Sequence, residues 1–219
     1  MRLSFSQWEN YAQCPRRWKH GYIDKMPRTP AGPAAQRGSA IHDQIEQCIK
    51  EHRLGPVVNF PVSHHIDVIA RFGNHKNGEL HTEYKVAFDG KWNRTLPEAS
   101  TVRFVGVFDA VLHRPGEVEI GEWKTGKPKD THADQRRLYT LMAFRTWGVE
   151  RVTATTYYFD NTSEPARLTA KASSVTKLIK IWDDRARQME ADTFWPPRPG
   201  FYCRWCDYAK SKGGPCPFS

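Results

Sequence analysis

Two acidic residues and a lysine, on what read as neighbouring strands, are the residues best suited to chemistry. Twelve residues separate Asp109 from Glu122, and Lys124 follows two positions later. Side chains alternate along a strand, so Glu122 and Lys124 project from one face. Carboxylates together with substrate phosphate oxygens are the ligands that Mg²⁺ prefers, and the bound cation acidifies a water molecule. The pattern therefore suggests metal-assisted hydrolysis of a phosphate ester.

The spacing also predicts how the two acids meet. If Pro115 and Gly116 form the centre of a hairpin turn, facing residues have numbers that sum to 231, and Asp109 then stands opposite Glu122. Their Cβ atoms would lie ~5 Å apart. A solvated acid–base cluster on a half-exposed hairpin would show the same residues at the same spacing, and short motifs recur by chance.

Hydrophobic periodicity and breaker residues divide the chain into alternating helices and strands. Ser4 or Ser6 is expected to cap the first helix, and Pro15 to break it near Cys14. The expected helices are 6–23, 38–53, a short 65–72, 135–148 and 173–192, and the expected strands are 81–88, 101–113, 117–125 and 152–160. Residues 27–36 and the tail from 194 read as loops. This order predicts an α/β fold, with a central mixed sheet flanked by helices.

Length and charge limit the class of protein. The 219 residues suit one domain, and a net charge of +9 suits a polyanionic partner such as DNA or RNA. No apolar run approaches the ~20 residues of a membrane span. The N-terminus has no signal-peptide core, so we expect a cytoplasmic protein.

The chain has five cysteines, and three of them lie near its end. Cys203 and Cys206 form a chelating CxxC pair, Cys216 follows, and Cys14 is the natural fourth ligand. Four thiolates can bind Zn²⁺ or an iron–sulfur cluster, and spacing alone does not choose between them. Cys48 reads as a core residue.

The acid–acid–lysine set resembles the PD-(D/E)XK nuclease superfamily. Gly106-x-x-Asp109 looks like the GxxD strand of that family, and the segment 38–42, which ends in His42, looks like the GxxxH helix of RecB-like nucleases. The segment from Gln135 to Tyr139 resembles the QxxxY motif. Over nearly the whole chain, the resemblance is to stand-alone RecB-like exonucleases that are associated with CRISPR systems and also carried by phages.

The resemblance implies a restriction-endonuclease-like core and a set of roles. His42, Asp109, Glu122 and the backbone carbonyl of Trp123 would hold the cation, and a mixed nitrogen and oxygen site suits Mn²⁺ as well as Mg²⁺. Lys124 would assist the attacking water. Two further residues, Gln135 and Tyr139, would support the site or position DNA. Glu83 could be another acid near the metal, but it reads better as an exposed strand carboxylate.

The resemblance further implies a [4Fe–4S] cluster on Cys14, Cys203, Cys206 and Cys216, with structural Zn²⁺ as the alternative. The nine residues between the last two cysteines are more than is usual in the family. Segments 1–26 and 195–219 would form the cluster region, and 80–160 the catalytic sheet and helix, all within one nuclease domain, 1–219.

These residues predict a divalent-metal-dependent DNA nuclease, and the resemblance implies an exonuclease acting on single-stranded DNA ends. Two alternatives stay open: a structure-specific or restriction-type endonuclease, and a DNA-binding subunit without catalysis. Expected partners are DNA and a separate helicase or a recombination or CRISPR-adaptation protein, since the chain has no motor segment. No residue sets the cleavage polarity.

Overall fold

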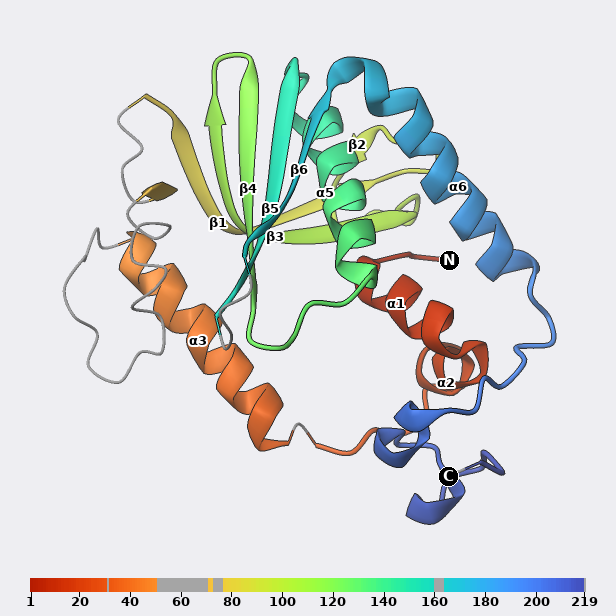
Figure 1. Ribbon diagram of the computed structural model, residues 1–219. Helices are drawn as coiled ribbons and strands as arrows, with labels where there is room; N and C mark the ends of the chain where they lie inside the picture. The colour runs from red at the N-terminus through yellow and green to blue at the C-terminus, as the bar shows by residue number, and fades with distance from the viewer. Residues whose placement is uncertain (31, 51–70, 73–76, 160–163, 219) are drawn as a thin grey trace.

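A six-stranded mixed sheet forms the centre of the molecule (Figure 1). The computed structural model describes residues 1–30, 32–50, 71–72, 77–159 and 164–218. The strand order is β2-β1-β3-β4-β5-β6; β4 and β5 are parallel and the other neighbours antiparallel. The strands are β1 (Glu79–Phe88), β2 (Arg94–Thr95), β3 (Phe104–Arg114), β4 (Glu117–Lys124), β5 (Arg151–Tyr158) and β6 (Ala166–Lys171).

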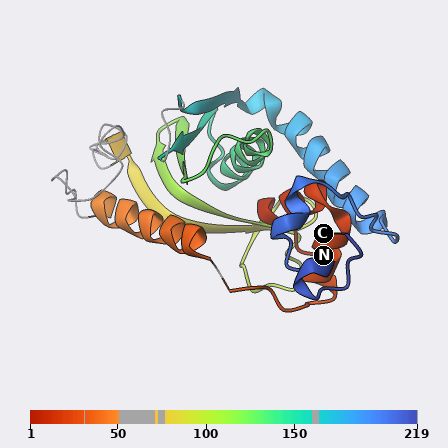
Figure 2. The same cartoon turned by 60° about the horizontal axis from the view of Figure 1, so that its bottom comes forward.

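Helices cover both faces of the sheet and confirm the expected restriction-endonuclease-like α/β class. The main helices are α1 (Phe5–Gln13), α2 (Pro15–Trp18), α3 (Pro33–Lys50), α5 (Thr131–Trp147) and α6 (Val175–Ala191). Figure 2 shows α3 on one side of the curved sheet and α5 on the other. Two buried apolar clusters correspond to these two faces, one including α3 and the other α1, α5 and α6.

Short helical turns complete the chain. The π-helical turn η1 (Lys19–Ile23) follows α2, and η3 (Ala172–Ser174) leads into α6. The C-terminal segment carries η4 (Phe201–Trp205) and η5 (Lys210–Lys212). Among the described helices, none is long and apolar enough to cross a membrane.

The N-terminal break occurs where the sequence predicts it. The first helix ends at Gln13, Cys14 is extended with φ −159°, and Pro15 opens α2. Proline is tolerated in a first helical turn because its missing N–H has no partner there. Ser4 caps α1 by accepting a hydrogen bond from the Gln7 N–H, so the alternative cap at Ser6 is wrong.

Other boundaries differ from the expectation. α3 begins at Pro33, inside the segment expected to be a loop, and α5 begins at Thr131, four residues early. β2 and β6 were not predicted. β6 alternates between exposed and half-buried residues at the sheet edge and has no apolar run. Most of the predicted helix 65–72 lies outside the described residues.

The β3–β4 hairpin has the predicted register. Arg114 pairs with Glu117 and Ala110 with Gly121, so partner numbers sum to 231. Gly116 has φ 77° in the turn, a left-handed conformation that glycine adopts without strain.

β1 and β3 are irregular at one pair of residues. Glu83 and Asp109 stand opposite one another in register, but the ladder omits them. Phe108 packs in the core beneath α5, whereas Ala110 packs in the core beneath α3. Residues two apart on a regular strand share a face, so β3 changes face at Asp109. Glu83 has φ 47°, a conformation that is uncommon for a residue with a Cβ.

Gly121→Ala tests the packing around the hairpin. A Cβ at this position would lie 2.5 Å from Trp123 Cη2 and 2.9 Å from the Phe72 ring. We expect a loss of about 1–3 kcal/mol in the free energy of unfolding, because both rings are buried. Gly126→Ala is the matched control, since a Cβ there meets no atom within 4 Å. Equal losses in urea titrations of the two variants would contradict this packing.

Candidate active site

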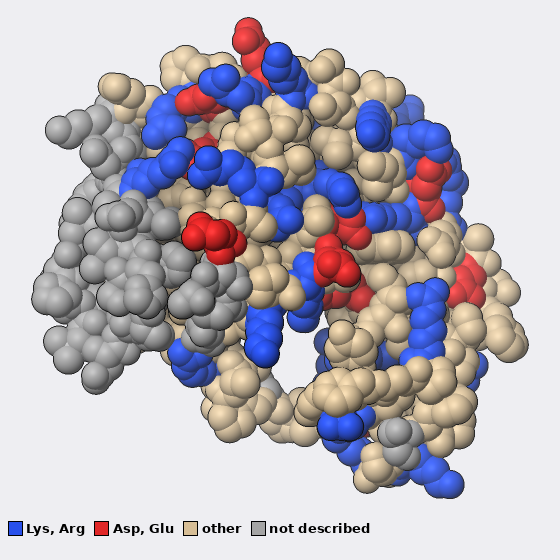
Figure 3. All heavy atoms as spheres, in the orientation of Figure 1, with Lys and Arg blue, Asp and Glu red and all other residues tan. Residues whose placement is uncertain are grey.

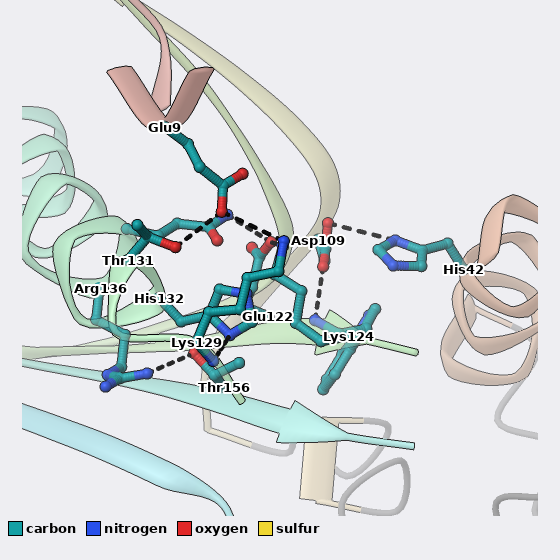
Figure 4. A network of polar contacts seen from close by, with 12 residues as sticks. Glu9, His42, Asp109, Glu122, Lys124, Lys129, Thr131, His132, Arg136 and Thr156 are labelled. Atoms are coloured by element: carbon teal, nitrogen blue, oxygen red, sulfur yellow. Dashed lines mark hydrogen bonds and ion pairs between the residues drawn. The ribbon is translucent and has the colours of Figure 1, made fainter. Parts of the chain in front are cut away.

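The predicted catalytic residues converge at the point where β3 changes face (Figure 4). Asp109 lies on β3, Glu122 and Lys124 on β4, and Gln135 on the first turns of α5, while His42 approaches from α3. Three separate parts of the chain, the β3–β4 hairpin, α5 and α3, therefore meet at one site.

Glu122 is the most buried acid of the site, with 5% of its surface exposed. Its Oε1 accepts hydrogen bonds from Lys124 Nζ at 2.6 Å and Gln135 Nε2 at 2.5 Å. Its Oε2 is buried and has no partner within the described part of the chain. Burial, followed by the charge of Asp109, raises the pKa of Glu122 to about 7.

Asp109 joins the two strands at the end of their ladder. Its Oδ2 accepts the Trp123 backbone N–H at 2.7 Å, and its Oδ1 lies 3.6 Å from His42 Nδ1. The carboxylate therefore takes the place of a backbone partner for β4, beyond the Ala110–Gly121 pair. The backbone N–H of Trp123 faces this carboxylate, and the predicted role of the Trp123 carbonyl stays a prediction.

A group of potential metal ligands surrounds Asp109. One ligand atom each from His42, Glu83 and Asp109 lie within 4.8 Å of one another. Glu83 is exposed, as expected, yet it also belongs to this group. Burial, and then the charge of Asp109, raise the pKa of Glu83, and the Asp109 carboxylate helps to raise that of His42 against the opposing effect of burial.

These donors fit a divalent cation. Carboxylate oxygens with one imidazole nitrogen suit Mg²⁺ and Mn²⁺. The unpartnered Glu122 Oε2 is a buried acceptor beside Asp109, and a buried polar atom without a partner is destabilising. A cation shared by the carboxylates would remove both the repulsion between them and this unmet hydrogen-bonding capacity.

Lys124 serves as a fixed positive charge. Burial alone would lower its pKa, but the charges of Glu122 and Asp109 outweigh burial and the pKa is raised. The ammonium group is therefore protonated at neutral pH and cannot act as a general base.

α5 supplies two residues of the predicted QxxxY motif. Gln135 contacts Glu122 directly, whereas Tyr139 packs edge-to-face on Phe108 with ring centroids 5.0 Å apart. Gly106 on β3 lets α5 pack closely against this strand, because a Cβ at this position would lie 2.6 Å from Met142 Sδ. Burial raises the Tyr139 pKa well above its usual value, so its hydroxyl is neutral.

Two residues beside the site were missed by the sequence reading. The His132 ring lies 3.0 Å from the Tyr158 hydroxyl through Nδ1, and burial, followed by the charge of Lys124, lowers its pKa to about 4. Glu9 on α1 accepts a hydrogen bond from Thr131 Oγ1 at 2.8 Å. The sequence predicts a polar loop at His132, whereas the structure places this residue in the first turn of α5. Only its position soon after the catalytic strand could have indicated it.

The four cysteines of the predicted cluster line one pocket, formed by the N-terminal and C-terminal segments. Cys14 Sγ accepts the Arg198 N–H at 3.5 Å, and Cys203 Sγ accepts the Gly200 N–H at 3.4 Å. Burial, opposed by nearby hydrogen bonding, raises the pKa of Cys206, and the other thiols add to the rise. No three of these sulfur atoms lie within 4.8 Å of one another. Cys48 lies on α3 and does not line this pocket.

Comparison with known proteins assigns the family. The model of the PD-(D/E)XK nuclease superfamily matches residues 2–60 and 59–211. The chain belongs to the PD-(D/E)XK nuclease superfamily. Members of this superfamily use divalent metal ions, which agrees with the donor set around Asp109.

Two solved structures are similar to this chain, and the first supports the fold. A Eubacterium rectale protein provisionally named an exonuclease is 11% identical and covers 96% of this chain and 87% of its own, with a TM-score of 0.53. An alkaline exonuclease from Laribacter hongkongensis, LHK-Exo, is 11% identical over 87% of this chain and 88% of its own, with a TM-score of 0.44. No curated protein matches.

His132→Phe tests the electrostatics beside the site. The unfolded chain gains a proton near pH 6.5 and the folded chain only near pH 4, so wild-type stability falls as the pH falls through this window. Between pH 7 and pH 5, the free energy of unfolding of the variant should fall by up to about 2 kcal/mol less than that of wild type. Urea unfolding at both pH values measures this difference, and parallel losses would show that the histidine is not held neutral.

Proposed function

We propose that this nuclease hydrolyses phosphodiester bonds of DNA with a divalent cation, as an exonuclease acting on single-stranded ends. The observation that carries the proposal is the buried, half-satisfied carboxylate of Glu122. It lies beside the His42–Glu83–Asp109 group and is held by Lys124 and Gln135. A structural ion pair would not need an imidazole and three carboxylates at one irregular point of the sheet.

The cation would be held by His42, Asp109 and Glu122, with the carbonyl of Trp123 and the exposed Glu83 as further ligands. Mg²⁺ or Mn²⁺ at this position supplies an acidified water and stabilises charge on the phosphate. Glu122 presents Oε2 to this site because Lys124 and Gln135 occupy Oε1.

Lys124 orients the attacking water and neutralises the phosphate as a permanent cation. Gln135 fixes the rotamer of Glu122, and Tyr139 supports Gln135 from one turn further along α5. This division of roles follows from contacts: Gln135 touches a proposed ligand, whereas Tyr139 touches the core.

A nucleic-acid substrate is supported by the net charge of +9, and action at DNA ends is implied by the family resemblance. A fold does not fix its substrate, so a structure-specific or restriction-type endonuclease is the second candidate. A separate helicase or a recombination or CRISPR-adaptation protein would supply strand opening or the biological target. The acid–acid–lysine set argues against a purely DNA-binding role.

We further propose that Cys14, Cys203, Cys206 and Cys216 bind a [4Fe–4S] cluster that joins segments 1–26 and 195–219. All four cysteines line one pocket between these segments, and backbone N–H groups point at the sulfur atoms of Cys14 and Cys203. A tetrahedral Zn²⁺ site with Zn–S bonds of about 2.3 Å holds its sulfurs about 3.8 Å apart. The family resemblance favours the iron–sulfur cluster, and structural Zn²⁺ stays the alternative.

Lys124→Ala tests the proposed activity. With Mn²⁺ and end-labelled linear single-stranded DNA, we expect cleavage at least about 100-fold slower than wild type, because transition-state charge loses its stabilising group. DNA binding should be retained. Lys127→Ala, which changes an exposed lysine three residues away, is the control and should cleave normally.

The same assay distinguishes the candidate activities. An exonuclease degrades the linear strand and spares a closed circular strand, whereas cleavage of the circle indicates an endonuclease. Wild-type protein that binds DNA but cleaves neither substrate with Mg²⁺ or Mn²⁺ would contradict the proposal.

Cys206→Ala tests the cluster. We expect anaerobically purified wild type to contain iron and show broad visible absorption, and the variant to lose both and unfold at a lower temperature. Cys48→Ala is the matched control, since this cysteine lies outside the pocket, and it should retain the iron. A colourless, zinc-containing wild type would overturn the cluster assignment.

A further inference from the structure

A groove of about 620 Å³ lies beside the proposed active site and is not used by the catalytic residues. One wall is α1 and α2, the other is the loop between β4 and α5, and the C-terminal segment closes one end. The lining residues that matter here are Asn10, Gln13, Arg17, Lys129, Thr131 and Tyr202.

The groove leads to the catalytic residues. Glu9, which also lines it, accepts the Thr131 hydroxyl and lies 3.6 Å from Lys129 Nζ. Figure 4 shows these three residues beside Glu122 and Lys124, while His42 approaches from the other side in that view. A strand leaving the active site on the α1 side would therefore enter the groove.

Figure 3 shows that the molecule is hollowed between the sheet and the C-terminal segment, and that Lys and Arg side chains border the hollow. In the same orientation, Figure 1 places α1, the loop after β4 and the C-terminal segment around this opening. The elements around this opening include those whose residues line the groove.

One exposed aromatic ring, that of Tyr202, lines the groove, and Phe201 and Trp205 are its neighbours on η4. Tyr202, Phe201 and Trp205 are 56%, 61% and 56% exposed, although large aromatic side chains are usually mostly buried. The Arg204 guanidinium lies 4.0 Å from the Phe201 centroid and 5.4 Å from that of Trp205. Rigid rings with attached positive charge suit unpaired bases and their phosphates.

The groove is lined by two acids, Glu9 and Asp130, and two basic residues, Arg17 and Lys129. The acid Glu9 is paired with Lys129 and bonded to Thr131, so its charge is partly compensated. Arg17 makes its hydrogen bond to the neutral amide of Gln13, so its positive charge is not neutralised by that contact.

We propose that this groove holds the unpaired strand adjacent to the scissile phosphate, with Tyr202 stacking on one of its bases. The substrate class is then a single strand or a single-stranded tail, because bases within a duplex already stack on one another. This inference rests on the proposed nuclease function and adds where the strand lies and which side chain recognises it.

The test is Tyr202→Ala, measured by fluorescence anisotropy with a labelled oligothymidine in the absence of divalent cations. Loss of one stacking contact should weaken binding by about 5- to 100-fold. Tyr202→Phe keeps the ring and should bind like wild type. Phe194→Ala is the matched control, since Phe194 is 74% exposed but does not line the groove. A blunt duplex should compete poorly with the labelled strand.

Unchanged DNA binding by Tyr202→Ala, or an equal loss of affinity in Phe194→Ala, would overturn the proposal that this groove holds the strand. Because Tyr202 precedes a proposed cluster ligand, thermal unfolding and metal content of each variant are measured in parallel. Should Tyr202→Ala not fold, photo-crosslinking of wild type to 5-iodouracil DNA replaces it, and a crosslink at Tyr202 is expected. Crosslinks confined to residues outside the groove would contradict the proposal.

The two proposals fail separately. Wild type that cleaves DNA while Tyr202→Ala binds normally would disprove the groove alone. A Tyr202-dependent single-strand affinity in a protein that cleaves nothing would disprove the nuclease function alone.

Discussion

Mutual repulsion among carboxylates at the centre of the sheet is the constraint on which the rest of the structure depends. Asp109 and Glu122 are 8% and 5% exposed, and burial strengthens the repulsion between them. Lys124, Gln135 and the Trp123 N–H compensate part of this charge, yet Glu122 Oε2 keeps no partner among the described residues. Such an arrangement is destabilising by itself and would become favourable on binding a cation. Metal-dependent hydrolysis requires a cation bound in this way.

Several irregular features of the fold follow from this constraint. β1 and β3 leave their ladder at Glu83 and Asp109, so two carboxylates turn toward His42 instead of into either core. Gly106 lets α5 pack closely on β3, and this contact allows Gln135 to reach Glu122. Local strain such as the positive φ of Glu83 persists where the surroundings hold it in place, and functional sites are common examples.

Much of this site could be predicted from the sequence because its main determinants are local. The hairpin register depends only on the turn at Pro115 and Gly116, and the positions of Glu122 and Lys124 depend only on strand periodicity. The sequence favours Glu83 as an exposed strand carboxylate over an acid near the metal, because regular alternation gives no sign that two adjacent strands change face together. β6 was missed since an edge strand needs no apolar run, and Tyr202 and Glu9 approach the site only through tertiary packing.

The most direct test of the central claim is the stability of Asp109→Asn against wild type, in urea, with and without Mn²⁺. The amide can still accept the Trp123 N–H but removes one of the mutually repelling charges. We predict that the variant is more stable than wild type without metal and gains little from Mn²⁺. Wild type should be stabilised progressively as the Mn²⁺ concentration rises. Wild type that gains nothing from Mn²⁺, or a variant that gains as much, would contradict the account of a carboxylate site built for a cation.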